Sequence, residues 1–315
     1  MNPTKVSVII PVYNTEEYIG ETLNSIINQT LRDIEIIVIN DGSTDNSLQI
    51  INEYAQRDSR ITVFTQVNQG QSMARNFGIL QACGDYLYFM DSDDLLDECT
   101  LELCFHKCET ENLDFVIFNG ETIKNPSSNI KLTYNHCTSY DDNTLSDGLT
   151  ILKKQLANKI FTPSPCLSFI KANYLRTNNL KFYPNIIHED QLFTFNLYLK
   201  AKRISSIPRP LFKRRIRNNS TMTQRFSLKN MNGYFTVSNE ILKHRQDGNK
   251  VLNKTIDLFL FQMLNATSYG ASTLPFIDRV YVVKILIFKY FRYVTVKSLL
   301  RILLSALLNK HKSCL

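Results

Sequence analysis

The first 96 residues alternate between short apolar segments and segments whose apolar residues recur at helical spacing. Lys5–Val12 and Ile34–Asn40 are β-branched apolar runs, which is typical of strands buried on both faces of a parallel sheet. Two further strands are predicted at 61–65 and 86–91, with helices between the strands at 16–29, around 48–55 and at 71–83. This alternation predicts an α/β fold with a mostly parallel, doubly wound sheet and helices on both faces.

Three polar clusters follow strands of this predicted sheet. They are Pro11–Asn14, Asn40–Asp45 and Asp91–Asp94. In open α/β sheets, ligands bind outside the carboxyl ends of the strands. The clusters therefore predict a ligand site at that edge.

The cluster Asp91-Ser92-Asp93 has the composition of a divalent-metal site, because hard cations prefer carboxylate oxygens. A bridging metal can stabilise a departing diphosphate as a Lewis acid and template. The alternative is an aspartate-rich turn that caps the next helix.

Together with their neighbours, these clusters resemble glycosyltransferase family 2, the inverting group with the GT-A fold. The resemblance is carried by VSVIIPVYN at 6–14, IEIIVINDGSTDNS at 34–47, NQGQSMARNFGI at 68–79 and GDYLYFMDSDDLL at 84–96, and more thinly by NIIHEDQLF at 185–193 and FKRRIRNNST at 212–221. It implies a Rossmann-like GT-A domain over 1–225, with a nucleotide-binding half at 1–97 and an acceptor-binding half at 98–225. From 226 to 315 the pattern indicates a helical C-terminal region, with Pro275 as a break.

The resemblance also implies a donor site for a UDP-sugar with Mn²⁺ or Mg²⁺. Tyr13 would lie against the base, Asp41 would accept a hydrogen bond from it, and Arg75 would approach the diphosphate. Asp93 would be the direct metal ligand, with Asp91 at the ribose or the metal. The implied donor residues are Pro11, Tyr13, Asn14, Asp41, Arg75, Asp91, Ser92, Asp93, Arg215 and Arg217. Each also has an ordinary alternative, such as a turn aspartate or an exposed helical arginine.

Glu189-Asp190 resembles the acidic pair that supplies the catalytic base. Inversion needs a carboxylate that takes the proton of the attacking hydroxyl; Asp190 is the predicted base, and Glu189 the predicted contact to a sugar. The alternatives are a helix N-cap or an exposed acidic pair. The basic run at 213–217 would lie over the leaving diphosphate. The residues before Arg215 are Phe212, Lys213 and Arg214, which departs from the aromatic pair usual in the family.

Charge divides the chain unevenly. Residues 1–199 contain 14 Lys/Arg and 25 Asp/Glu, a net charge of −11, whereas residues 200–315 contain 22 Lys/Arg and 4 Asp/Glu, a net charge of +18. A basic C-terminal part indicates an anionic partner, and the acidic first half argues against nucleic acid. On a helical wheel of 280–308, Lys297, Ser298, Arg301 and Ser305 share a narrow face among leucines, as in a helix lying in a membrane interface. The alternative is a helix packed on the main domain.

These features predict an inverting, metal-dependent transfer of a hexose (galactose, glucose or an N-acetyl form) to a glycan or lipid-linked acceptor. The resemblance favours bacterial surface polysaccharide synthesis, such as capsule or lipooligosaccharide, at the cytoplasmic face of the membrane; the N-terminus shows no signal peptide. The absence of G-x-G-x-x-G after the first strand argues against a dehydrogenase. Two alternatives remain open: a sugar nucleotidyltransferase, and a non-catalytic nucleotide-sugar-binding protein on the same fold.

Overall fold

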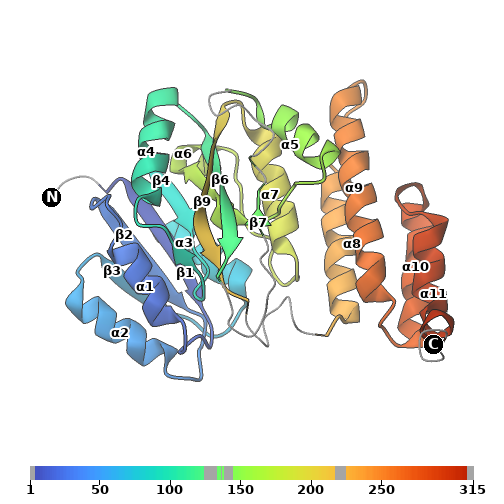
Figure 1. Cartoon of the computed structure of the whole chain (residues 1–315), viewed down its shortest axis with the longest axis horizontal. Helices are drawn as coiled ribbons and strands as arrows, with labels where there is room; N and C mark the ends of the chain where they lie inside the picture. Colours follow the sequence, from blue (N-terminus) through green and yellow to red (C-terminus); the bar gives the residue numbers. More distant parts are fainter. Residues whose placement is uncertain (1–3, 124–132, 136, 138–144, 217–224, 311–315) are drawn as a thin grey trace. The chain divides into compact units, whose positions relative to one another are not determined.

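The computed structural model describes residues 4–123, 133–135, 137, 145–216 and 225–310, with side chains up to residue 304 (Figure 1). Its strands are β1 (Val6–Val12), β2 (Ile34–Asn40), β3 (Ile61–Thr65), β4 (Tyr86–Phe89), β5 (Leu95–Leu96), β6 (Phe115–Thr122), β7 (Thr133–Tyr134), β8 (Ser168–Lys171) and β9 (Ile204–Arg214). Its α-helices are α1 (Ile19–Ile27), α2 (Ser47–Arg57), α3 (Gln71–Gln81), α4 (Thr100–Glu111), α5 (Gly148–Ala157), α6 (Ala172–Thr177), α7 (Glu189–Lys200), α8 (Leu228–Leu242), α9 (Lys250–Ala271), α10 (Phe276–Tyr290) and α11 (Val296–Lys310). Two 3₁₀ turns, η1 (Pro165–Leu167) and η2 (Phe291–Tyr293), complete the set.

The strands form one mixed sheet in the order β3-β2-β1-β4-β8-β6-β9-β5, with β7 paired to β6. The first four strands in this order run parallel to one another, as predicted. Strand β8 joins β4 and β6 in antiparallel pairs. The carboxyl ends of β1, β2 and β4 therefore share one edge of the sheet.

Strand β1 is buried along its whole length because helices cover both faces of the sheet. Val8 and Ile10 belong to one apolar cluster with residues of α1 and α4. Ile9 points to the other face, where α3 packs so closely that a Cβ on Gly78 would lie 2.4 Å from the Ile9 Cγ2. The predicted α/β fold with helices on both faces is confirmed.

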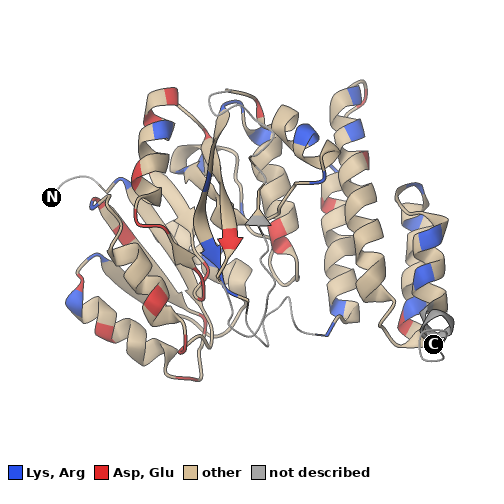
Figure 2. Ribbon diagram, viewed as in Figure 1, with Lys and Arg blue, Asp and Glu red and all other residues tan. Residues whose placement is uncertain are grey.

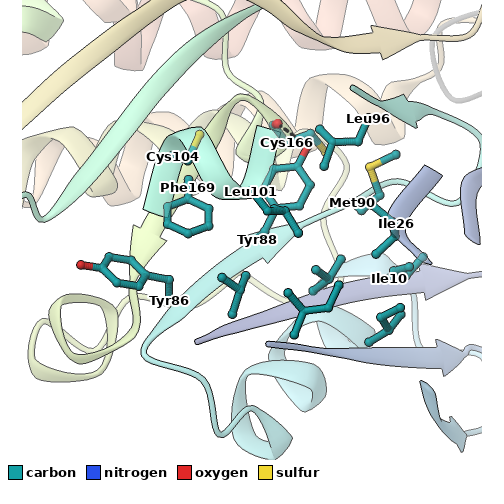
Figure 3. Close-up of a cluster of buried hydrophobic side chains, with 14 of the residues drawn as sticks. Ile10, Ile26, Tyr86, Tyr88, Met90, Leu96, Leu101, Cys104, Cys166 and Phe169 are labelled. Carbon is teal, nitrogen blue, oxygen red and sulfur yellow. Dashed lines mark hydrogen bonds between the residues drawn. The ribbon is translucent and has the colours of Figure 1, made fainter. Parts of the chain in front are cut away.

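Aromatic residues of β4 anchor the apolar cluster next to the predicted site (Figure 3). Tyr86 stacks on Phe169 of β8 with a centroid distance of 5.0 Å. The fully buried Tyr88 donates its hydroxyl hydrogen bond to the Cys166 carbonyl at 2.9 Å, which satisfies the one polar group of that side chain. These contacts hold β4, and the strand end that carries Asp91, against the rest of the sheet.

The chain divides into two compact units. One comprises Met1–Asn185 and Phe193–Arg217, and the other comprises Ile186–Leu192 and Asn218–Leu315. The second unit is built from α8, α9, α10 and α11 together with the segment that leads into α7. Helix α9 ends at Ala271 and α10 begins directly after Pro275, so the predicted break is confirmed. The domain boundaries at 97 and 225 stay predictions.

The turn η2 interrupts the segment 280–308, and the described residues of the polar stripe on α11 have different environments. Lys297 is exposed, whereas Ser298 and Arg301 face α9. The membrane-interface interpretation of this stripe stays a prediction. Ser298 is buried and donates a hydrogen bond to Asn265 at 2.7 Å. The Arg301 guanidinium lies 3.8 Å from the centre of the Tyr269 ring and donates to the Ser268 hydroxyl. The side chain of Ser305 lies outside the described residues.

Candidate active site

The loops after β1 and β2 are joined through Asn14, which has a left-handed backbone with φ of 50°. Its side chain accepts a hydrogen bond from the Thr44 backbone N–H at 2.8 Å, and its own backbone N–H donates to the Ser43 hydroxyl at 3.2 Å. Pro11 is buried within β1, whereas Tyr13 is 48% exposed. The structure thus gives Asn14 a loop-joining role and leaves the Tyr13 ring accessible at the sheet edge.

Asp41 is buried and already serves as an acceptor for three donors. The Gln66 side chain and the backbone N–H groups of Gln69 and Gly70 donate to its carboxylate at 2.7, 2.9 and 2.8 Å. These bonds hold the loop between β3 and α3 beside the end of β2. The hydrogen bond from a nucleotide base to Asp41 stays a prediction. In the structure, Asp41 holds the loop between β3 and α3.

Arg75 and Asp91, which lie 16 residues apart in the sequence, form an ion pair. Arg75 Nη2 donates to Asp91 Oδ1 at 2.6 Å, and the Arg75 side chain is only 3% exposed. Its guanidinium also lies 4.9 Å from the centre of the Phe182 ring. Gln71 Nε2 donates to the same Asp91 oxygen at 3.0 Å. The alternative of an exposed helical arginine is therefore wrong, and Arg75 orients one carboxylate of the predicted metal pair.

Arg215 contacts the same aspartate-rich turn at Asp93 and Asp94. Its backbone N–H donates to Asp94 Oδ1 at 2.7 Å, and its Nε donates to the Asp93 carbonyl at 3.0 Å. Its Nη2 pairs with Glu21 at 2.6 Å, and the guanidinium lies over the Tyr18 ring. Four separate contacts therefore attach Arg215 to the turn and to α1. Arg217, the second predicted arginine of this run, lies outside the described residues.

Thr22 and the buried Asp94 stabilise the turn at 91–94 from its buried side. The Thr22 hydroxyl donates to the carbonyls of Ser92 and Asp94 at 3.1 and 2.9 Å. Asp94 is 2% exposed, and this burial, together with the charges of Asp91 and Asp93, raises its pKa well above the usual range. Sequence patterns did not identify Thr22, Glu21 or Gln71 as site residues. Gln71 lies within the motif at 68–79 but was not assigned a role, and Thr22 and Glu21 are single polar residues of a helix outside any motif.

The carboxylates of Asp91 and Asp93 fit a metal ion that is shared with a substrate. Across the described part of the chain, no group of three or more His, Cys, Asp or Glu side chains could enclose a metal by itself. Mg²⁺ at nucleotide sites is commonly held by one or two carboxylates, with phosphate oxygens and waters as the other ligands. The aspartate pair, partly accessible at the end of β4, offers this donor set.

Glu189 and Asp190 begin helix α7 in the second compact unit. The Gln191 backbone N–H donates to Asp190 Oδ1 at 2.9 Å. The preceding residue, His188, has a left-handed backbone with φ of 71°, and burial lowers the pKa of its ring to about 4. The ring is therefore neutral at pH 7. The joint action of this pair with the strand-end clusters of the other unit stays a prediction.

Comparisons with known proteins bear on the family and the fold of this chain. The family model described as "Glycosyl transferase family 2" matches residues 7–178. The putative glycosyltransferase EpsH of Bacillus subtilis is 33% identical over 269 residues, which are 82% of this chain and 75% of EpsH. The poly(ribitol-phosphate) beta-glucosyltransferase of Bacillus spizizenii is 36% identical over 211 residues, which are 64% of this chain and 30% of that protein.

Among solved structures, residues 1–349 of S. aureus TarS in complex with UDP-GlcNAc superpose with a TM-score of 0.68. The match covers 97% of this chain and 92% of the TarS chain at 22% sequence identity. At this identity the likeness establishes a shared fold.

Proposed function

Because this chain belongs to glycosyl transferase family 2 and is a glycosyltransferase, we propose that it transfers a hexose from a UDP-sugar with inversion at the anomeric carbon. The observation that carries the proposal is the constrained turn at 91–94. Arg75 orients Asp91, while Arg215 and Thr22 hold the turn from the other side. The bound UDP-GlcNAc of TarS, a protein of the same fold, supports a UDP-sugar as the donor.

The donor would lie along the carboxyl edge of β1, β2 and β4. Tyr13 offers an exposed aromatic face for the base, and Asp41 lies at the neighbouring strand end. Asp93 and Asp91 would hold Mn²⁺ or Mg²⁺ against the diphosphate. Such an ion, when bound, supplies Lewis-acid stabilisation of the negative charge that develops on the leaving group.

Asp190 is the proposed base. As the acceptor hydroxyl oxygen forms a bond to C1 of the sugar, its proton passes to the Asp190 carboxylate. The bond between C1 and the β-phosphate oxygen breaks on the opposite face, and UDP leaves with the electron pair. Glu189 would contact the acceptor or the donor sugar. Arg217 and Arg215 belong to the basic run proposed to offset the charge of the leaving diphosphate.

A panel of UDP-glucose, UDP-galactose and their N-acetyl forms, each with Mn²⁺ or EDTA, tests the proposal through UDP release. We expect one donor to be turned over preferentially, with the activity lost in EDTA and restored by added Mn²⁺. Full activity in EDTA would contradict metal dependence. Release of pyrophosphate in place of UDP would identify a nucleotidyltransferase and overturn the proposal.

The acceptor is proposed to be a glycan or lipid-linked intermediate of bacterial surface polysaccharide, assembled at the cytoplasmic face of the membrane. The name of one relative, the poly(ribitol-phosphate) beta-glucosyltransferase of Bacillus spizizenii, supports a polymer acceptor of this kind. In the described residues, no helix is both long and apolar enough to span a bilayer. The proposed contact with the membrane is made by a surface of the C-terminal unit.

Helix α10 offers such a surface within the C-terminal unit. Ile277 and Phe288 are each 81% exposed, the same face carries Phe276, Val280, Tyr281 and Ile287, and Phe291 of η2 is exposed next to it. Lys284, Lys289 and Arg292 are exposed beside them, and Figure 2 shows basic residues recurring along this helix. An apolar helix face flanked by cations matches the interface of an anionic bilayer. The proposed membrane contact is thus the outward face of α10.

The double substitution Ile277→Asn and Phe288→Asn is expected to weaken binding to phosphatidylglycerol-containing vesicles about tenfold or more. The variant lacks two large apolar side chains whose burial in the bilayer interface would stabilise the bound state. Co-sedimentation with these vesicles, compared with pure phosphatidylcholine vesicles, measures the effect. Leu80→Asn, at a 74% exposed position on α3, is the matched control and should bind as the unaltered protein does. Equal binding of the double variant and the control would exclude this face as the membrane contact.

A further inference from the structure

The segment that leads into the Glu189–Asp190 pair is packed against α8. Residues Ile186–Leu192 belong to the same compact unit as the C-terminal helices, although their sequence neighbours on both sides belong to the other unit. The segment therefore receives its local support from residues more than 30 positions later in the chain. Three residues near the start of α8, Asn230, Gly233 and Tyr234, provide this support.

Gly233 brings the two backbones into direct contact. A Cβ at this position would lie 2.3 Å from the Ile187 carbonyl oxygen and 3.2 Å from its carbonyl carbon. Real Cβ atoms do not approach a carbonyl oxygen this closely, and backbone cannot turn aside as a flexible side chain does. Any larger residue must therefore displace α8 or the segment that precedes Glu189.

His188 is held in place by an aromatic stack. Its ring lies on that of Tyr234 with a centroid distance of 4.0 Å and an interplanar angle of 18°. Its left-handed backbone, with φ of 71°, is costly for a residue other than glycine, and such conformations persist where surrounding contacts enforce them. The stack is a contact of this kind, and it fixes the residue immediately before the acidic pair.

Asn230 connects this stack to the start of α8. Its Nδ2 lies 3.4 Å from His188 Nε2, while its Oδ1 accepts hydrogen bonds from the backbone N–H and the hydroxyl of Ser227 at 2.9 and 2.8 Å. Burial and the charge of Asp190 together raise the pKa of Tyr234 to about 12. Helix α8 thus contacts the two residues that immediately precede the acidic pair.

We propose that Asn230, Gly233 and Tyr234 are positioning residues that fix the carboxylates of Glu189 and Asp190 for proton transfer. The inference rests on the proposed function, in which Asp190 is the base. It assigns the C-terminal helical unit a part in the chemical step, separate from any membrane contact through α10.

Gly233→Ala is the first test, with the preferred donor of the UDP-sugar panel as the probe. A displacement of about 1 Å at a catalytic group can cost about 10²-fold in rate. We expect kcat to fall by about this factor while the KM for the donor changes less than about threefold, because donor-binding groups lie at the sheet edge. A smaller folded fraction would also lower the apparent kcat without changing KM, so the folded fraction of the variant is measured by circular dichroism and kcat is expressed per folded molecule.

Gly270→Ala is the matched control. A Cβ there would lie 2.4 Å from the Phe226 ring, a comparably close contact within the same unit that does not involve the segment before Glu189. This variant should keep the kcat of the unaltered protein. An equal loss of kcat in both variants would indicate general damage to the unit and overturn the inference.

Tyr234→Leu and Tyr234→Phe keep the inference testable if Gly233→Ala fails to fold. Leucine removes the stack on His188 and should lower kcat, whereas phenylalanine retains the stack and should restore most of it. If Tyr234→Leu keeps full kcat while Asp190→Asn is inactive, the positioning role is wrong and the base assignment stands. If Asp190→Asn itself is fully active, the proposed function fails at its base, and the positioning role fails with it.

Discussion

Asp190→Asn is expected to lower kcat for sugar transfer by about 10²–10⁴-fold, the range of a general base. The amide has nearly the same shape as the carboxylate but cannot accept the proton of the acceptor hydroxyl. The KM for the donor should change little, because the diphosphate and base contacts are assigned to Asp93, Asp91 and Tyr13. Steady-state UDP release in the presence of acceptor measures both constants.

Asp247→Asn is the control for this substitution. Asp247 is an exposed aspartate of the same compact unit, so its replacement makes the same chemical change away from the proposed chemistry. This variant should keep the kcat of the unaltered protein. Full activity of Asp190→Asn would show that Asp190 is not the base, and the proposed function would fail at this step.

Asp93→Asn is expected to remove most metal-dependent activity. Lewis-acid stabilisation is worth several kcal/mol, and about 4 kcal/mol corresponds to roughly a thousandfold loss of rate. The fold should survive, since Asp93 is partly exposed and the turn is held mainly through backbone carbonyls and Asp94. Donor turnover across a Mn²⁺ titration, together with thermal unfolding of the variant, separates loss of metal binding from loss of structure.

Asp85→Asn provides a matched comparison, because the exposed Asp85 precedes the same strand, β4, at its amino end. It should leave both the activity and its Mn²⁺ dependence unchanged. If Asp93→Asn retains activity that EDTA still abolishes, the metal is held by other residues. Activity that EDTA does not affect in either protein would remove the metal from the mechanism.

Much of the parallel half of the sheet could be predicted because its strands are buried on both faces. A continuous β-branched run such as 34–40 has few other stable environments. The antiparallel half was much harder to predict. Strand β5 has two residues, and β8 pairs with β4 across more than 80 positions of chain. Neither the length of a short strand nor its partner leaves a periodic pattern in the residues themselves.

The candidate site also has a part that the sequence predicts and a part that depends on packing. Asp91 and Arg75 were identified by their motifs, but their ion pair depends on how α3 packs against β1 and β2, beside the end of β4. Thr22 and Glu21 hold the turn through contacts that span about 70 and 194 positions, and their residue types are common on exposed helices. On α11 the wheel pattern does not show which residues of the polar stripe are buried: Ser298 and Arg301 hydrogen-bond to Asn265 and Ser268 of α9, whereas Lys297 is exposed.

The residue order alone therefore settled the fold class, the family and the strand ends that carry the polar clusters, since burial and turn formation act over neighbouring positions. The arrangement in space settled which polar groups meet: Arg75 with Asp91, Arg215 with the turn at 91–94, and α8 with the segment before Asp190. Hydrogen bonds and ion pairs act over a few ångströms, so they depend on which distant segments the packing brings together. The spacing of residues along the chain does not show which of these groups come into contact.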